Sequence, residues 1–119
     1  MKVKKRQHEA FPDGIAEIYD NQAKSGVGNI PRDKLVLRYK LHMREKTVGI
    51  NRFYSALQNN SLIERMVRCP RRNDVSVLDV VRLFSAGTEG EYYRIAQIQY
   101  PEDVEPAVMD IALERVDVT

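Results

Sequence analysis

Histidine, cysteine and converging carboxylates are the side chains from which most metal and nucleophilic sites are built. This chain offers only His8, His42 and Cys69 as soft or borderline ligands. His8 lies in a polar N-terminal segment, and His42 falls on the outward face of a predicted strand, so these ligands are not expected to converge. Any nucleophilic triad would have to use His42. Cys69 ends a predicted β run just before Pro70 and is better explained as a small core residue.

Other patterns that could carry chemistry are equally incomplete. Glu102 and Asp103, like Glu89 and Glu91, lie in predicted turns, where carboxylates are usually solvated. The glycines at 26 and 28 lack the lysine and the strand-to-helix setting of a phosphate-binding loop. We therefore expect no enzyme, no cofactor and no metal.

Basic and aromatic residues leave nucleic-acid binding open as an alternative. One strand face carries three cations, and three tyrosines could stack bases in a small barrel: Arg38, Lys40 and Arg44, with Tyr92, Tyr93 and Tyr100. Aromatic residues in strands more often pack the sheet, and the balanced net charge of +2 is unlike that of a dedicated binder.

The composition indicates one domain. With 119 residues and 43% hydrophobic residues, the chain can bury a single core without disulfides or metals. Its one cysteine cannot form an internal disulfide, which fits a reducing cytoplasm. No run approaches the roughly 20 apolar residues of a membrane span, and no apolar segment follows the basic N-terminus. We divide the chain into a basic segment, 1–14, and one domain, 15–119; the segment is either a solvated terminus or a tail that touches an acidic partner or nucleic acid.

The clearest pattern is a period of two over Leu35, Leu37, Tyr39, Leu41 and Met43. The residues between them are mostly basic. This alternation predicts a half-buried strand with a basic outer face.

Similar runs predict further strands at 15–19, 62–70, 78–84, 92–100 and 107–116, with turns at 85–90 and 101–106. Ile50, Phe53, Tyr54 and Leu57 have helical spacing. The prediction is an all-β fold: a small antiparallel β-barrel or sandwich of five to six strands, with one short helix or long loop between the second and third strands. The expected core residues are Leu37, Tyr39, Leu41, Val67, Val80, Ile95, Ile98, Ile111 and Leu113.

The order of these pieces resembles the head-tail joining, or head closure (stopper), proteins of long-tailed phages. Three segments carry the resemblance: 48–60 (VGINRFYSALQNN), 63–70 (IERMVRCP) and 91–99 (EYYRIAQIQ). The resemblance as a whole covers roughly residues 35–116. The basic N-terminal segment and the 101–106 insertion depart from the usual family pattern.

The resemblance implies a non-catalytic virion protein, assembled in the bacterial cytoplasm. It would form an oligomeric ring below portal and adaptor, close the DNA-filled head and provide the docking surface for the tail. Its implied partners are itself, portal and adaptor proteins, tail terminator or tail proteins, and DNA passing through the channel. The alternative within phage structure is another connector subunit, an adaptor or tail-completion protein.

By the same resemblance, the segment 45–60 would project into the ring and could block the DNA channel. The implied channel-facing or ring-contact residues are Val48, Gly49, Arg52, Tyr54, Gln58, Asn59 and Asn60. We expect the segment to be ordered by assembly, against the alternative of a fixed short helix packed through Phe53, Tyr54 and Leu57. The free subunit is expected to be largely monomeric, with ring formation dependent on a preformed partner surface.

Overall fold

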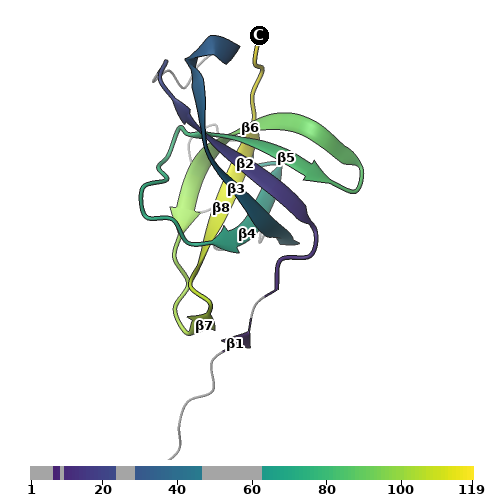
Figure 1. Cartoon of the computed structure of the whole chain (residues 1–119), viewed down its shortest axis with the longest axis vertical. Helices are drawn as coiled ribbons and strands as arrows, with labels where there is room; N and C mark the ends of the chain where they lie inside the picture. Colours follow the sequence, from purple (N-terminus) through teal and green to yellow (C-terminus); the bar gives the residue numbers. More distant parts are fainter. Residues whose placement is uncertain (1–6, 9, 24–28, 47–62) are drawn as a thin grey trace, which may run out of the picture.

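Six antiparallel strands close into a barrel (Figure 1). The computed structural model describes residues 7–8, 10–23, 29–46 and 63–119, and among these residues there is no α-helix. The barrel strands are β2 (Gly14–Asn21), β3 (Leu35–Lys46), β4 (Arg65–Pro70), β5 (Val80–Ser85), β6 (Thr88–Gln99) and β8 (Val108–Arg115). The prediction of a small all-β barrel is confirmed. The segment expected to hold a short helix or long loop falls largely outside the described residues.

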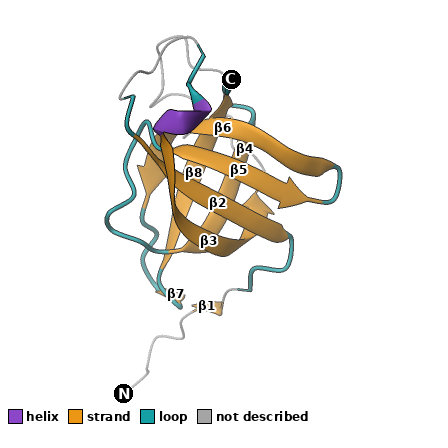
Figure 2. Ribbon diagram, turned by 45° about the horizontal axis from the view of Figure 1, so that its top comes forward, coloured by secondary structure: helices purple, strands orange, loops and turns teal. Residues whose placement is uncertain are grey.

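One crossover interrupts the otherwise sequential strand order of the barrel (Figure 2). Its strands lie in the order β2-β3-β4-β8-β6-β5, and β5 closes the barrel against β2. Barrel strands that follow one another in the sequence are neighbours, as is usual, except at the connection 71–79. This connection carries the chain from β4 to β5, beside the first strand of the barrel. It therefore lies against strands distant in sequence.

Strand β3 confirms the strand that the period-two pattern predicted, but not every residue predicted to point into the core does so. Ile18 on β2 pairs with Tyr39 and Tyr19 pairs with Leu37, so Arg38 is an extra residue in the ladder. Such a bulge puts the alternation on its two sides out of phase. Leu41 and Met43 point into the core, whereas Leu37 is 45% exposed. The assignment of Leu37 to the core was therefore wrong.

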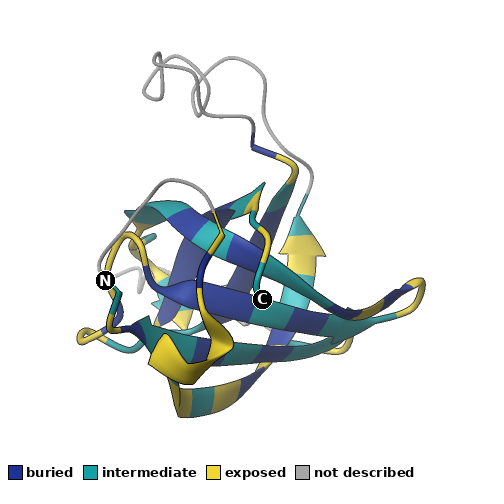
Figure 3. Cartoon of the chain, turned by 90° about the horizontal axis from the view of Figure 1, so that it is seen from above, coloured by how far each residue is buried: buried dark blue, intermediate teal, exposed yellow. Residues whose placement is uncertain are grey.

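The remaining expected core residues are buried or pack against the core. One cluster fills the barrel, and in Figure 3 buried and exposed residues alternate along several strands. Val80 is buried, and Tyr39 and Ile98 are partly buried against the cluster. The members of the cluster are Ala16, Ile18, Leu41, Met43, Val67, Cys69, Val75, Val81, Leu83, Tyr93, Ile95, Met109, Ile111 and Leu113.

Strand β8 is buried on both of its faces. Its inward residues belong to the barrel core, but the alternating residues Val108, Asp110 and Ala112 are buried as well. On the outer surface, Ala112 packs with Ile63 and Met66 in a second apolar cluster. The β4 side of the wall is therefore two layers thick at this point.

Short pairings tie down segments outside the barrel. β1 (Gln7–His8) pairs in parallel with β7 (Val104–Glu105). His8 therefore lies in a paired strand, and the predicted turn at 101–106 contains the short strand β7. A 3-10 turn, η1 (Arg32–Lys34), precedes β3. Ile30 bridges to Val118 near the C-terminal end. Among the described residues no helix is long and apolar enough to span a membrane.

Candidate functional site at the barrel rim

The long connection 47–64 leaves the barrel at the end of β3 and returns at the start of β4. These two strands are antiparallel neighbours, with Lys46 opposite Met66. Two such strands can be joined by about two to five residues. The much longer excursion marks this rim as the most unusual feature of the chain.

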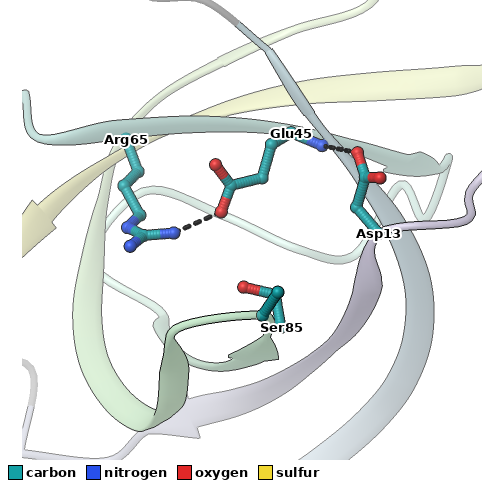
Figure 4. Close-up of a pocket in the computed structure, with 5 residues that line it drawn as sticks. Asp13, Glu45, Arg65 and Ser85 are labelled. Atoms are coloured by element: carbon teal, nitrogen blue, oxygen red, sulfur yellow. Dashed lines mark hydrogen bonds and ion pairs between the residues drawn. The ribbon is translucent and has the colours of Figure 1, made fainter.

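A cavity of about 260 Å³ opens at this rim (Figure 4). Its lining comes from four places in the chain: Asp13 before β2, Glu45 on β3, Arg65 on β4, and Ser85 with Ala86 at the end of β5. Glu45 and Arg65 are also close to the two roots of the connection 47–64. The cavity therefore lies beside the point where the connection leaves and rejoins the barrel.

Hydrogen bonds hold most of the polar lining in place. The Glu45 amide donates to Asp13 Oδ2 at 2.9 Å, and the Arg65 guanidinium forms an ion pair with the Glu45 carboxylate. Figure 4 shows the Ser85 side chain below this pair. Ser85 Oγ is buried and has no hydrogen-bond partner among the described residues. The rim thus combines two carboxylates held by internal bonds with one buried hydroxyl that has no partner among the described residues.

An ion cluster fixes the neighbouring part of the rim on the outer wall. Arg68 Nε lies 2.7 Å from Asp110 Oδ1 and Arg68 Nη2 lies 3.0 Å from Oδ2. Lys46 Nζ lies 3.1 Å from the same Oδ2. Arg68 is only 7% exposed and Asp110 only 4%. Bidentate geometry and a second cation compensate the cost of burying this carboxylate.

Both roots of the connection are held to β8, the first of them by the ion cluster. Lys46 is the last residue of β3, and Asp110 holds it to the middle of β8. On the returning side, Ile63 is buried and the Glu64 amide donates to the Leu113 carbonyl at 2.9 Å. The residues that flank the connection are therefore anchored by a salt bridge, a buried apolar side chain and a backbone hydrogen bond.

The rim does not have the arrangement of a nucleophilic centre. The Glu45 carboxylate is bound to Arg65, and His42 is exposed on the barrel wall, away from the cavity lining. Within the described residues no group of three or more histidine, cysteine or acidic side chains is placed to hold a metal ion. Cys69 lies in the core, where burial raises the pKa of its thiol to about 12. Its predicted place in the core is confirmed.

The seven residues assigned by resemblance to the channel or ring contact lie outside the described residues. They are Val48, Gly49, Arg52, Tyr54, Gln58, Asn59 and Asn60. Their role stays a prediction. The described structure places only the roots of that segment.

The predicted basic contact face on β3 is partly neutralised. Arg38 binds Asp74, and Lys40 lies 3.8 Å from Glu17 while its side chain stays 63% exposed. Arg44 is half-buried and lies opposite Arg68. Of the three cations, Lys40 is therefore the one most open to a partner.

Asp74 is held by two consecutive residues of the β3 bulge. Arg38 donates to its backbone oxygen at 3.0 Å and to its carboxylate, while the Tyr39 hydroxyl lies 2.6 Å and 2.7 Å from the two carboxylate oxygens. The hydrogen bond from Tyr39 lowers the pKa of Asp74, and the same bond raises the pKa of Tyr39. The bulge thus lets neighbouring side chains converge on one carboxylate.

The tyrosines do not form the stacking surface considered from the sequence. Tyr93 is 3% exposed and belongs to the core, which agrees with the packing role and leaves its ring unavailable to a base. The Arg82 guanidinium carbon lies 5.0 Å from the Tyr92 ring centroid, and that of Arg71 lies 4.8 Å from the Tyr100 ring centroid. These rings are already covered by arginines of the same chain.

Sequence reasoning missed Asp13, Ser85 and the ion cluster. A signal for the cluster was present, because Arg68 interrupts the apolar run of β4 and Asp110 interrupts that of β8. A charge within a buried strand needs a partner.

No family model, curated protein or solved structure matches this chain.

Proposed function

We propose that this chain is a structural subunit of the head-tail connector of a long-tailed phage. It would form a ring below portal and adaptor, close the DNA-filled head and present a docking surface to the tail, without catalysing a reaction. The proposal places it in the virion, at the head-tail interface, after assembly in the bacterial cytoplasm. Its support is the order of the three resembling segments in the sequence, together with the small antiparallel barrel to which the second and third contribute strands β4 and β6.

The observation that carries the proposal is the long connection between neighbouring strands. The resemblance predicts an excursion between the second and third strands, and β3 and β4 are the second and third strands of this barrel. A connection of this length is uncommon between neighbouring strands of a compact domain, and it is usually either functional or a linker. The buried ion cluster and the packed root at Ile63 give this one a fixed base.

The rim suits contact between proteins better than chemistry. It presents oriented carboxylates at Asp13 and Glu45, and neighbouring subunits or partners could use their remaining acceptor positions for polar contacts. The proposed partners are further copies of the chain, portal and adaptor proteins, tail terminator or tail proteins, and the DNA that passes through the ring.

Co-elution with a portal–adaptor assembly from the same genome tests the proposal. The chain should elute alone as a small species and shift to the volume of the assembly when the two are mixed. Portal without adaptor serves as the control for non-specific adsorption. Separate elution from the complete assembly at micromolar concentration would contradict the connector role.

Two alternatives remain distinguishable by experiment. A small-barrel nucleic-acid binder would retain DNA or RNA in a gel shift at moderate salt; the burial of Tyr93 and the pairing of Arg38 with Asp74 make the described surface less suited to it. An adaptor or tail-completion subunit would occupy a different position in the connector from the ring below portal and adaptor. Adaptors of this kind are usually mainly helical, whereas the described chain is a β-barrel.

A further inference from the structure

Three buried side-chain oxygens at the barrel rim have no hydrogen-bond partner among the described residues. They are Ser85 Oγ at the end of β5, and Thr88 Oγ1 and Glu91 Oε2 on β6. Thr88 as a whole is only 2% exposed. Buried polar atoms in folded proteins nearly always have a partner, because giving up water without a replacement bond is costly. Three such atoms therefore favour a bound group that donates hydrogen bonds.

Strand register places all three side chains on the inner face of the barrel wall. Ser85 and Thr88 lie directly opposite each other, and Glu91 lies opposite the core residue Leu83. Opposed residues share a face, with Cβ atoms about 5 Å apart, and Ser85 shares a face with Leu83 two positions earlier. Gly90 is an extra residue in β6, so Thr88 and Glu91 face the same side although they are three positions apart.

The rim cavity lies beside these oxygens. Ser85 forms part of its wall together with Glu45 and Arg65, and in Figure 4 the ion pair between Glu45 and Arg65 lies above the Ser85 side chain. Glu45 is opposite the core residue Val67, so it belongs to the same inner face. Pockets for drug-sized ligands measure about 300–1,000 Å³. A cavity of about 260 Å³ is suited to a single side chain instead.

Charge and hydrogen-bonding capacity select a cation. Three carboxylates, of Asp13, Glu45 and Glu91, face one guanidinium, that of Arg65. Arg115, the last residue of β8, is exposed to solvent. A carboxylate accepts several hydrogen bonds, whereas an ammonium or guanidinium group has only donors. Such a group matches the unpartnered oxygens and the excess of negative charge.

The Arg65 side chain is the movable part of the site. It is 28% exposed and its printed hydrogen bonds go only to Glu45, so it can turn toward solvent without breaking a buried contact. Exposed ion pairs of this kind contribute little to stability. An incoming cation can therefore take the place of Arg65 at Glu45 and reach the oxygens below.

We propose that the rim cavity binds the ammonium or guanidinium group of one lysine or arginine side chain of a partner protein. The cation replaces Arg65 at Glu45 and donates hydrogen bonds to Ser85, Thr88 and Glu91. This inference deepens the polar contact proposed for the rim, and it rests on the proposed function only for the identity of the partner.

NMR titration of the full chain with capped amino acids tests the site without any connector protein. The probes are the N-acetyl methylamides of arginine, lysine and citrulline, the last of which has nearly the shape of arginine but no charge. The two cationic probes should shift the amide resonances of Ser85, Thr88 and Glu91 saturably and leave that of Gln99, at the far end of β6, unchanged. Citrulline should bind roughly tenfold more weakly than arginine, because it cannot form charge-assisted bonds.

Two substitutions at the site should act in opposite directions. Glu91→Gln should weaken binding of the arginine probe roughly fivefold, whereas Arg65→Gln should strengthen it roughly two- to fivefold, since the competing cation is gone. The matched control is Glu114→Gln, which also has a buried oxygen without a hydrogen-bond partner among the described residues but pairs with Arg94 and lies outside the rim. It should leave the affinity unchanged.

Thr88→Val removes the unpartnered hydroxyl and keeps the shape of the side chain. Urea unfolding should show no loss of stability, because no hydrogen bond is broken, while the arginine probe should bind more weakly. A clear loss of stability would show that the hydroxyl is already bonded to internal water and would overturn the inference. Equal affinities for arginine and citrulline, or weaker binding by Arg65→Gln, would also overturn it. None of these results changes the outcome expected for co-elution with portal and adaptor.

Discussion

Arg68 on β4 and Asp110 on β8 face each other on the outer wall of the barrel and form two hydrogen bonds, of 2.7 Å and 3.0 Å. Both side chains are buried although they point away from the barrel core. Lys46 adds a second cation at 3.1 Å. This one carboxylate therefore links β3, β4 and β8 at the base of the connection 47–64.

Replacing Asp110 by Asn should destabilise the barrel severely. The substitution leaves the buried Arg68 charge without its counter-charge, which typically costs about 3–5 kcal/mol. The matched control is Glu114→Gln, which breaks the more exposed pair with Arg94, 2.9 Å apart between β8 and β6. That change should cost less than about 1 kcal/mol. Urea unfolding of both variants makes the comparison, and similar costs would show that the Asp110 cluster has no special role.

Leu41 and Leu37 provide a test of the bulge in β3. Leu41 is buried in the core cluster and Leu37 is exposed, although both fit the same alternation in the sequence. Leu41→Ala should lower the free energy of unfolding by about 2–5 kcal/mol. Leu37→Ala should change it by less than about 1 kcal/mol. A large loss for Leu37→Ala would mean that its side chain is buried and that the ladder has no bulge at Arg38.

Much of the fold could be predicted from local patterns, because alternation determines which face of a strand is buried. The bulge at Arg38 could not, since it depends on the register with β2. The Asp110 cluster joins residues 42 and 64 positions apart in the chain, so no local pattern contains it. The rim cavity is likewise assembled from four separate segments.

Gly90 should be hard to replace because its backbone lies in the left-handed region and a side chain there would have to displace the Arg82 guanidinium. Its φ is +90°, and a Cβ would lie 2.8 Å from Arg82 Nε, which donates to the Gly90 carbonyl at 3.0 Å. The Arg82 guanidinium also lies 5.1 Å from the Phe84 ring centroid and 5.0 Å from that of Tyr92. Gly90→Ala should therefore cost about 1–3 kcal/mol in thermal or urea unfolding.

Gly87→Ala separates backbone strain from this steric conflict. Gly87 has φ of +79°, but a Cβ added there would have no atom of the described residues within 4 Å beyond its chain neighbours. Its replacement by alanine should lower the free energy of unfolding only by the cost of the left-handed backbone conformation, about 1 kcal/mol. The additional cost at Gly90 should disappear when both variants are compared in an Arg82→Ala background. An equal cost for the two glycines in the native background would refute the steric explanation.

Cys69 should make stability fall at alkaline pH. Burial, with a smaller contribution from Asp110, raises the pKa of its thiol from 9.0 to about 12. Between these values the folded chain binds more protons at this site than the unfolded chain, so stability is lost as pH rises. The slope from this group approaches about 1.4 kcal/mol per pH unit. Urea unfolding from about pH 8.5 to about pH 10 should show a steeper decline for the native chain than for Cys69→Ala, and identical slopes would contradict the shifted pKa.

Negative-stain imaging of the connector tests the central claim most directly. Purified portal and adaptor from the same genome are imaged with and without this protein, at the same concentrations and salt. The account predicts an additional ring of density on the adaptor side of the portal, present only in the mixture. Images without added density, together with no ring of the protein alone, would contradict its assignment as a head closure subunit.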